Sequence, residues 1–358
     1  MERELHIFNA GPSLLPREVL EDAAGAVMDF GGSGIPLLCT SHRSKEWNGL
    51  MDETRALWRE LLAVPDGYQV VLFSGGATMG FLLAAMNFLE RKAAYLDTGI
   101  WAHKALKEAQ GIGDAYAIAS SREDSYNHIP KGFVIPHDLD YLHVTTNNTV
   151  YGTEIREDID SPVPLVADMS SDILSRPVDV SRYAMIYGSA QKNAGTAGVA
   201  FAIVKTELLG RVSRHIPTLL DLRTYVDNGS MPNTPPVFPI YVMNRTLRWI
   251  LARGGVAAMQ ASDELKAGTL YAEIDRNPLF EGTAAVEDRS VMNVCFRMAA
   301  GNEGLEERFL AFSQECGIVG IKGYRTVGGF RASIYNACSQ DDVDALVKCM
   351  QDFEQHIS

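Results

Sequence analysis

The chain has 358 residues, of which 46% are hydrophobic and 22% are charged. This composition is ordinary for a globular enzyme of about two domains and speaks against a disordered chain. The 32 basic and 45 acidic residues give a net charge of −13, which argues against a general nucleic-acid binder. An acidic chain that binds an anionic substrate has to concentrate its arginines locally.

The five cysteines are scattered, odd in number and without Cys-x-x-Cys spacing. They predict neither a disulfide framework nor a zinc site, so we expect no metal. The N-terminus has no basic segment followed by an apolar stretch, and no run of about 18 apolar residues occurs. We therefore expect a cytoplasmic protein without a signal peptide or a membrane partner.

Between about residues 68 and 205, short apolar runs alternate with longer helical stretches. This pattern is typical of a mainly parallel sheet made of strand-helix units, with strands buried on both faces. The expected strands are residues 69–73, 93–97, 141–145, 165–168, 185–188 and 199–204.

Two helices are predicted after a proline-rich turn at residues 232–239. The first runs from about Ile240 to Leu251 and stops at two glycines, residues 254 and 255. The second begins near residue 256 and is expected to bridge to a smaller C-terminal domain. Its apolar positions are Val256, Met259, Leu265, Leu270 and Ile274.

A glycine-bearing loop, SGGATMG at residues 74–80, follows the first expected strand and precedes an apolar helix at Phe81–Leu89. Its backbone N–H groups and a hydroxyl could bind a phosphate at the helix N-terminus. A tight turn that needs the glycines only for its geometry would have the same sequence. The loop contains neither G-x-G-x-x-G nor G-x-x-x-x-G-K-[ST], which disfavours a nucleotide-binding α/β enzyme.

Two residues of opposite charge follow successive expected strands. Asp168 ends one strand, and Lys192 lies in a small turn after the next. Ligands of open sheets bind at the carboxyl ends of strands, where Thr98 and Thr146 also fall. Pyridoxal phosphate needs such a pair, because an amine holds its aldehyde carbon and an anion keeps its pyridine nitrogen protonated. A surface lysine and an aspartate that caps a helix remain the alternative.

Several collinear motifs cover nearly the whole chain and resemble those of the phosphoserine aminotransferases, which are fold-type-I pyridoxal phosphate enzymes. No single motif is specific, but their number and order are. They are FNAGP (8–12), SHRSKE (41–46), DTGIW (97–101), DMSSDILSRP (168–177), GSAQKN (188–193), DNGSMPNTPP (227–236) and GGFRASIYN (328–336).

The resemblance implies an α/β fold with two domains. The large pyridoxal-phosphate-binding domain would span residues 16–259 and contain a mainly parallel seven-stranded sheet. The smaller α/β domain would combine residues 1–15 with residues 260–358. The active unit would be a homodimer whose active sites are shared across the interface.

The resemblance also implies which residues bind the cofactor ring. Lys192 is the Schiff-base lysine, and Asp168 is the partner of the pyridine nitrogen. Trp101 stacks on the ring, although a lone tryptophan is otherwise more often a core residue. Thr149 contacts the phenolic oxygen of the ring.

The cofactor phosphate is assigned by the same resemblance. Ala77 and Thr78 occupy the phosphate position, and Gln191 is a neighbour of the phosphate beside the lysine. Asn233 and Thr234 match residues that reach the phosphate of the neighbouring subunit.

Substrate binding is expected to depend on arginines. Arg331 matches the residue that grips the α-carboxylate through a planar two-point contact, for which a lysine is a poor substitute. His42 and Arg43 match the pocket for a distal phosphate or γ-carboxylate, and Arg325 resembles a further contributor. Each arginine could instead be a solvated surface charge, which is the commoner situation for an isolated arginine.

Two positions depart from the family pattern. Some members have Gly-Arg where this chain has Ala77-Thr78, and His where it has Tyr324. Both changes remove cationic or ionisable groups from the expected phosphate pocket. We interpret them as variation between subgroups, because His42, Arg43 and Arg325 are present.

The implied reaction is a reversible amino transfer between O-phospho-L-serine and 2-oxoglutarate, giving 3-phosphohydroxypyruvate and L-glutamate, as in serine biosynthesis. The analogue 4-phosphohydroxy-L-threonine would link the chain to pyridoxine biosynthesis as well. An aminotransferase of the alanine or serine-glyoxylate type is the alternative, and it should lack the pocket at His42 and Arg43. A binding protein on a degenerate scaffold is disfavoured, because Asp168, Lys192 and Arg331 are all present.

Overall fold

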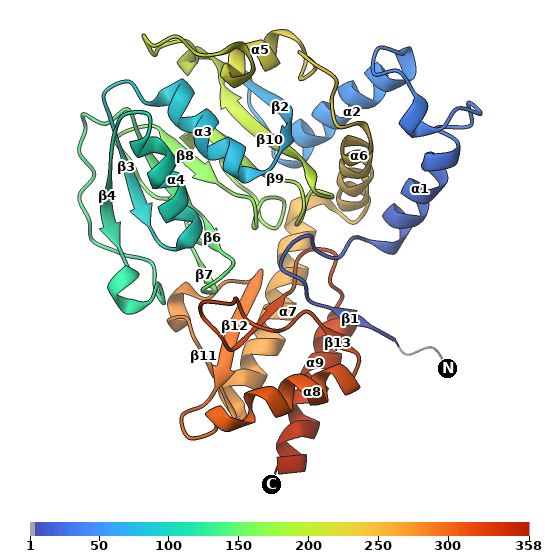
Figure 1. The fold of residues 1–358 in the computed structure, drawn as a ribbon, viewed down its shortest axis with the longest axis vertical. Helices are drawn as coiled ribbons and strands as arrows, with labels where there is room; N and C mark the ends of the chain where they lie inside the picture. The colour runs from blue at the N-terminus through green and yellow to red at the C-terminus, as the bar shows by residue number, and fades with distance from the viewer. Residues whose placement is uncertain (1–3, 358) are drawn as a thin grey trace.

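The computed structural model describes residues 4–357, and its centre is a sheet of seven strands in the order β2-β10-β9-β8-β5-β3-β4 (Figure 1). The strands from β9 to β4 pair in parallel, whereas β10 is antiparallel to both of its neighbours. The expected mainly parallel sheet is therefore confirmed. Its strands are β2 (Tyr68–Gly75), β3 (Lys92–Asp97), β4 (Asp114–Ser120), β5 (Tyr141–Thr145), β8 (Leu165–Asp168), β9 (Tyr183–Ser189) and β10 (Gly198–Lys205).

Six of these strands coincide with the apolar runs of the sequence, and β4 is the one that the pattern does not indicate. All residues of β5, β8 and β9 are buried, as expected for strands covered on both faces. In β4 only Ala115 is fully buried. This strand lies at the edge of the sheet, where its alanines give little β-propensity.

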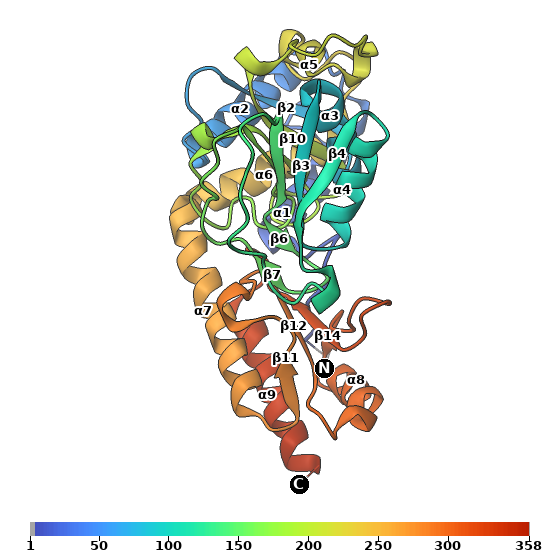
Figure 2. The ribbon, with the colours of Figure 1, turned by 90° about the vertical axis from the view of Figure 1, so that its left-hand side faces the viewer.

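Helices cover both faces of the sheet (Figures 1 and 2). On one face α3 and α4 form a core with Phe81, Leu106 and Tyr187. On the other face α1, α2 and α6 form a core in which the rings of Trp58 and Phe201 lie 4.5 Å apart. These helices are α1 (Arg17–Met28), α2 (Lys45–Leu61), α3 (Ala77–Phe88), α4 (Ile100–Gln110) and α6 (Val237–Ala252), with the short α5 (Leu222–Asp227) beside α3.

The C-terminal part of the chain has an aromatic core of its own, in which the rings of Phe309 and Phe330 lie 5.0 Å apart. Its antiparallel sheet has the order β11-β12-β14, with helices packed against it (Figure 2). Its elements are α7 (Gly255–Arg276), β11 (Phe280–Gly282), β12 (Asn293–Met298), α8 (Glu306–Glu315), β13 (Ile318–Val319), β14 (Phe330–Ser333) and α9 (Gln340–Ile357).

A continuous helix, α7, connects the two parts (Figure 2). It follows Gly254, whose φ of +97° ends α6 as a glycine stop predicts. Met259 packs in the core of the large part, whereas Leu270 and Ile274 pack in the C-terminal core. Leu265, counted among the apolar positions of this helix, is 62% exposed and belongs to neither core. The predicted boundary between residues 259 and 260 falls inside α7 and stays a prediction.

The N-terminal segment runs from the C-terminal part to the large part. β1 (His6–Ile7) pairs in parallel with β13, and Phe8 lies in the C-terminal core. The Ser13 N–H then donates to the Gln191 carbonyl at 3.0 Å. Residues 8–13 therefore cross from one core to the end of β9.

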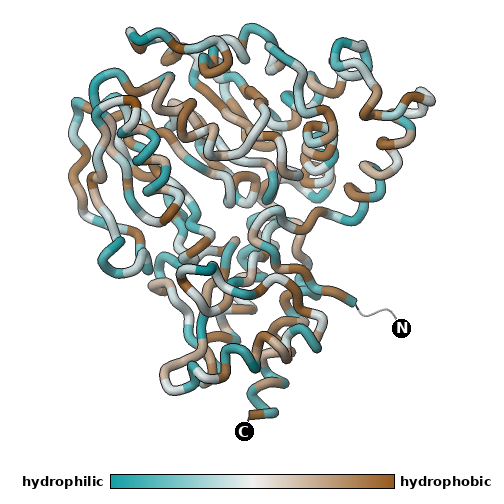
Figure 3. Tube along the Cα trace, in the orientation of Figure 1, coloured by the Kyte–Doolittle hydropathy of each residue, from teal (hydrophilic) through white to brown (hydrophobic). Residues whose placement is uncertain are grey.

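Apolar residues are frequent along the central strands, whereas many outer turns are hydrophilic (Figure 3). Within residues 4–357, no helix combines the length and the hydropathy that crossing a bilayer requires. The same residues contain no group of His, Cys, Asp and Glu side chains arranged to hold a metal ion.

Helix α3 packs so closely on the sheet that Gly80 has no room for a side chain. A Cβ atom there would lie 2.3 Å from Cδ2 of Tyr187, which is completely buried. Gly80→Ala should therefore lower the free energy of unfolding by about 1–3 kcal/mol through overpacking. Urea denaturation measures this free energy.

Gly25→Ala in α1 is the matched control, because a Cβ atom at Gly25 meets nothing within 4 Å. Replacing this helical glycine should raise the free energy of unfolding by about 0.5–1 kcal/mol. A Gly80→Ala protein as stable as the wild type would contradict the close packing of α3 on β9.

Candidate active site

The carboxyl ends of β8 and β9 lie side by side, because the two strands are adjacent and parallel. Asp168 is the last residue of β8, and Lys192 lies in the turn that follows β9. The charges of these two side chains affect each other's pKa, as expected for groups that lie close together. The structure thus brings the predicted carboxylate and amine to one edge of the sheet.

Asp168 is a buried carboxylate that is only partly satisfied. Its Oδ1 accepts hydrogen bonds from Ser170, from the backbone N–H at 2.9 Å and from Oγ at 2.6 Å. Within residues 4–357, its Oδ2 accepts no hydrogen bond. Burial raises the pKa of Asp168, while Ser170 and the charge of Lys192 oppose this effect. A cationic donor at Oδ2 would complete the site.

Lys192 has an amine that loses its proton unusually easily. Burial lowers the pKa of Lys192 to about 8, although the charges of Asp168 and Asp172 act in the opposite direction. The Ser13 hydroxyl donates to the Lys192 carbonyl at 2.9 Å and so fixes the turn. The lysine therefore has the properties of a nucleophile or a general base.

Gly11 lies directly against this lysine. A Cβ atom at Gly11 would lie 3.7 Å from Cε of Lys192 and 3.5 Å from Nε2 of Gln191. The φ of Gly11 is +147°, a conformation that favours glycine. The FNAGP motif therefore forms one wall of the lysine site.

The N-terminus of α3 presents free donors near the same strand ends. Helix α3 begins at Ala77, directly after Gly76, which has no side chain to cap the helix. Within residues 4–357, the N–H groups of Ala77 and Thr78 have no acceptor. A Cβ atom at Gly76 would lie 3.7 Å from Oγ of Ser189 at the end of β9. The turn is tight, and it also has the free donors that an anion needs.

Three further predicted residues form a connected group. Trp101, in α4, donates from Nε1 to Oγ1 of Thr149 at 3.1 Å. Arg331, in β14, donates from Nη1 to the Thr149 carbonyl at 2.9 Å, while its buried Nε has no partner within the described residues. Thr149 lies between β6 (Asn147–Asn148) and β7 (Thr153–Glu154). The group therefore joins the large part to the C-terminal part.

The other predicted residues lie on three exposed stretches of the chain. His42 and Arg43 precede α2, residues 233 and 234 precede α6, and Arg325 lies between β13 and β14. In the part of the chain that the structure describes, none of these five side chains makes a hydrogen bond or an ion pair. The structure does not join them to Lys192, and they are free to bind a ligand or another chain.

Three residues that shape the site received no role from the sequence. Ser170 orients Asp168, Gly11 packs on Lys192, and Asn193 donates from Nδ2 to the Ile173 carbonyl at 3.0 Å. An aspartate followed two residues later by serine is a local hydrogen-bonding pattern that could have indicated Ser170. The other two contacts join segments far apart in the chain, so no local pattern reveals them.

The lowered pKa of Lys192 predicts selective labelling in protein free of cofactor. Only an unprotonated amine reacts with trinitrobenzenesulfonate, so the rate at Lys192 should rise with pH and reach half its maximum near pH 8. Peptide mass spectrometry after labelling at several pH values measures this rate.

Lys205 serves as the reference, because its hydrogen bond with Glu207 raises its pKa. In the Asp168→Asn variant the midpoint for Lys192 should fall below pH 8, because a nearby negative charge is lost. If Lys192 and Lys205 react with the same midpoint, the proposed environment of the amine is wrong.

Comparisons with known proteins show the family of the chain. The sequence profile of the family described as Aminotransferase class-V matches residues 5–346. A phosphoserine aminotransferase of Bacteroides thetaiotaomicron is 59% identical over 98% of this chain and 99% of its own. The solved phosphoserine aminotransferase from Bacillus circulans subsp. alkalophilus is 42% identical, with a TM-score of 0.95 over 99% of both chains. The PLP-bound enzyme of the same name from Trichomonas vaginalis is 35% identical, with a TM-score of 0.92 over 97% of this chain and 100% of its own. The chain therefore belongs to the class-V aminotransferase family.

Proposed function

We propose that the protein is a phosphoserine aminotransferase, which transfers the amino group of O-phospho-L-serine to 2-oxoglutarate and works in serine biosynthesis. The observation that carries this proposal is the pair of the buried Asp168 and the half-buried Lys192, in which a carboxylate oxygen and an amine have no hydrogen-bond partner within residues 4–357. The relative with this name at 59% identity supports the substrate class.

The residues at the sheet edge fit pyridoxal phosphate. This cofactor supplies an aldehyde for the amine and a ring that accepts electrons from the substrate. Oδ2 of Asp168 suits a protonated ring nitrogen, and Nζ of Lys192 suits the aldehyde carbon. Trp101 offers an aromatic face, and the Thr149 hydroxyl, which accepts from Trp101, can donate to the phenolic oxygen.

The cofactor phosphate would bind at the N-terminus of α3. The free N–H groups of Ala77 and Thr78 and the positive end of the helix dipole favour a dianion there. Gln191, next to the lysine, is half-buried and has an amide that can donate to the same group.

Lys192 would carry the proton transfer. Nζ would hold the aldehyde carbon of the cofactor. As a free base, Nζ would accept the proton of the substrate α-carbon. Because the pKa of Lys192 is lowered to about 8, a larger share of the amine is neutral near pH 7 than in an exposed lysine.

Arg331 would bind the α-carboxylate of the substrate. Its Nη1 is fixed by the Thr149 carbonyl, and its Nε has no partner within residues 4–357, so the guanidinium is oriented and still able to donate. His42, Arg43 and Arg325 would bind the distal phosphate or γ-carboxylate. Their side chains are unpaired in the described chain, which leaves them available for this purpose.

We further propose a homodimer with shared active sites. Asn233 and Thr234 are exposed and make no side-chain hydrogen bond within residues 4–357, as expected if they serve the phosphate of a neighbouring subunit. Large apolar side chains on α1 and the segment after it are also exposed, which is typical of a surface that a second chain covers. They are Leu20, Met28, Ile35 and Leu38.

A cytoplasmic location fits the cysteines, because all five are free thiols. Free thiols are usual where glutathione and thioredoxin keep proteins reduced. Recovery of the protein outside the cytoplasmic fraction of lysed cells would contradict this location.

Substrate class can be tested by visible spectroscopy of the protein with bound pyridoxal phosphate. O-phospho-L-serine should convert the visible band to the amine form of the cofactor, whereas L-alanine and L-serine at the same concentration should not. Parallel addition of 4-phosphohydroxy-L-threonine tests the link to pyridoxine biosynthesis. If alanine converts the band equally well, the alanine or serine-glyoxylate alternative is favoured; if no band forms, the cofactor assignment fails.

Arg43→Ala sharpens this experiment. With this variant, the phosphoserine concentration needed to convert half of the visible band should be about 10- to 100-fold higher. The reason is that a hydrogen bond to a charged group is lost. The highly exposed Arg17, which pairs only with Glu21 in the described chain, provides the control Arg17→Ala. Equal effects of Arg43→Ala on phosphoserine and on an uncharged amino acid would defeat the assignment.

Shared sites can be tested with hybrid dimers. A chain with Lys192→Ala and a chain with both Asn233→Ala and Thr234→Ala should each lose most activity. If residues 233 and 234 serve the neighbouring site, dissociation and reassembly of a mixture should restore activity, because each hybrid then has one intact site. The same mixture without dissociation should stay inactive. Inactive hybrids, with their formation verified by native mass spectrometry, would exclude sharing through these residues.

A further inference from the structure

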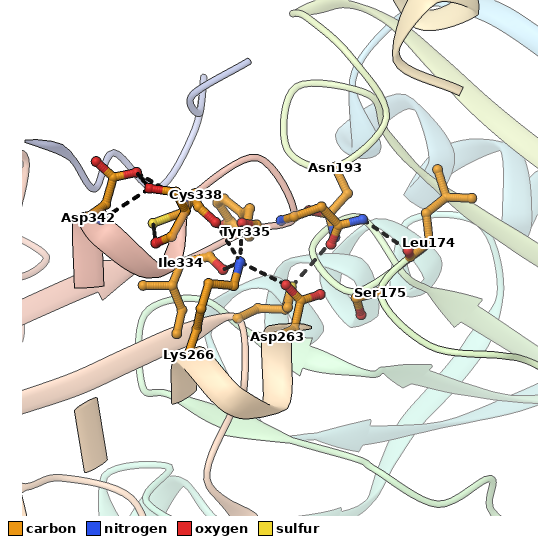
Figure 4. A network of polar contacts seen from close by, with 12 residues as sticks. Leu174, Ser175, Asn193, Asp263, Lys266, Ile334, Tyr335, Cys338 and Asp342 are labelled. Atoms are coloured by element: carbon orange, nitrogen blue, oxygen red, sulfur yellow. Dashed lines mark hydrogen bonds and ion pairs between the residues drawn. The ribbon is translucent and has the colours of Figure 1, made fainter. Parts of the chain in front are cut away.

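A second lysine, Lys266 in α7, is completely buried, and the network of polar contacts around it extends to Asn193 (Figure 4). Its ammonium group donates to the carbonyls of Ile334 at 3.0 Å, Tyr335 at 2.9 Å and Cys338 at 2.9 Å. It also forms an ion pair with Oδ1 of Asp263 at 2.8 Å. A buried charge requires such partners, so this lysine organises the turn formed by residues 334–338.

Asp263 depends almost wholly on this lysine. It is 1% exposed, and apart from the ion pair neither of its oxygens has a partner within residues 4–357. Burial raises the pKa of Asp263 to about 6, while the charge of Lys266 opposes this effect. Removing Lys266 alone would therefore leave an unpaired buried carboxylate.

The turn at residues 334–338 contacts both loops that carry the catalytic pair. The Asn336 N–H donates to Oδ1 of Asn193, the residue directly after Lys192, at 3.1 Å. Nδ2 of Asn336 donates to the carbonyl of Leu174 at 2.9 Å, in the loop that follows Asp168. Figure 4 shows this path from Lys266 through the turn to Asn193 and Leu174.

The loop after Asp168 needs an external support. Leu174 has a φ of +66°, a conformation that is unfavourable for a leucine. Its carbonyl is held by Asn336, and the preceding carbonyl, of Ile173, is held by Asn193. The support therefore comes from Asn336, in the turn that Lys266 organises, and from Asn193, which accepts a hydrogen bond from the same turn.

The same turn reaches two other parts of the site. The Tyr335 hydroxyl donates to the Ala10 carbonyl at 2.8 Å, next to Gly11, which packs on Lys192. The turn also continues directly from β14, which carries Arg331. The ammonium group of Lys266 thus holds a segment that contacts several of the chain segments around the amine of Lys192.

We propose that Lys266, paired with Asp263, is a positioning residue for amino transfer: it holds the turn at residues 334–338 against the loops of Asp168 and Lys192. Its ammonium fixes the distance between the lysine base of the large part and the arginine of the C-terminal part. Lys266 touches neither substrate nor cofactor and acts through Asn336 and Asn193. The inference rests on the proposed transamination.

The main test is the double variant Lys266→Met/Asp263→Leu, which removes both charges and keeps the side chains large. Hydrogen-deuterium exchange of the cofactor-free protein should become faster in residues 334–338 and also in residues 169–176 and 190–196. With cofactor and phosphoserine, kcat should fall about 10- to 100-fold while KM changes less, because a small displacement of the base slows proton transfer more than binding. The pH dependence of the visible band should also shift.

Asn277→Ala is the matched control, because it removes buried polar contacts at the end of the same helix. Asn277 is 2% exposed at the end of α7, where it donates to Glu273 and to the Met350 carbonyl. This variant should lower the melting temperature without changing kcat or the pH dependence of the band. Both variants are compared at a temperature where circular dichroism shows them folded.

A second variant keeps the test decisive if the double variant does not fold. Asn336→Ala leaves the ion pair of Lys266 intact and removes the contact with Leu174. It should accelerate hydrogen-deuterium exchange in residues 169–176 and lower kcat, as the double variant does.

The outcomes separate the possible explanations. If exchange changes only in residues 334–338 and kcat follows that of Asn277→Ala, Lys266 has a structural role only and the proposal is overturned. Exchange in cofactor-free protein needs no substrate, so a wild type that fails to convert phosphoserine would defeat the proposed function separately. Faster exchange at the two distant loops with an unchanged kcat would also overturn the positioning role.

Discussion

The parallel pairing of β8 with β9 is the constraint on which the site depends. Because the two strands point the same way, the chain leaves both at one edge of the sheet, with Asp168 on one and Lys192 after the other. Strand β10 is antiparallel to both β2 and β9, so β2 ends at the same edge, and the N-terminus of α3 follows it there. A carboxylate, an amine and a set of free N–H donors are thereby assembled by strand order alone.

Burial gives these groups their reactivity. The layers of helices reduce the contact of the strand ends with water. This burial raises the pKa of Asp168 and lowers the pKa of Lys192. Among the residues that the structure describes, Oδ2 of Asp168 and Nε of Arg331 have no hydrogen-bond partner. Unmet polar atoms of this kind are costly in an isolated chain, and a bound anionic ligand with a cationic ring nitrogen would satisfy them together.

Much of the fold and part of the site could be predicted from the sequence. Apolar runs identify six strands, because strands buried on both faces have a continuous apolar pattern, whereas the half-exposed β4 has none. Strand ends also indicate Asp168 and Lys192. The roles of Trp101 and Thr149 came from the family resemblance, since neither lies in a distinctive local pattern. The contacts of Lys266 could not be predicted, because they join α7 to a turn that is close only after folding.

The continuity of α7 fixes the length of the chain between its two parts. Each residue of an α-helix turns the following ones by about 100° around the helix axis. One residue inserted between Gly255 and Asp263 would therefore rotate Lys266 and the C-terminal part together relative to the large part, and would separate Asn336 from Asn193 and Leu174. A change in the number of residues in this helix would therefore disturb the site, whereas a change in the identity of an exposed residue would not.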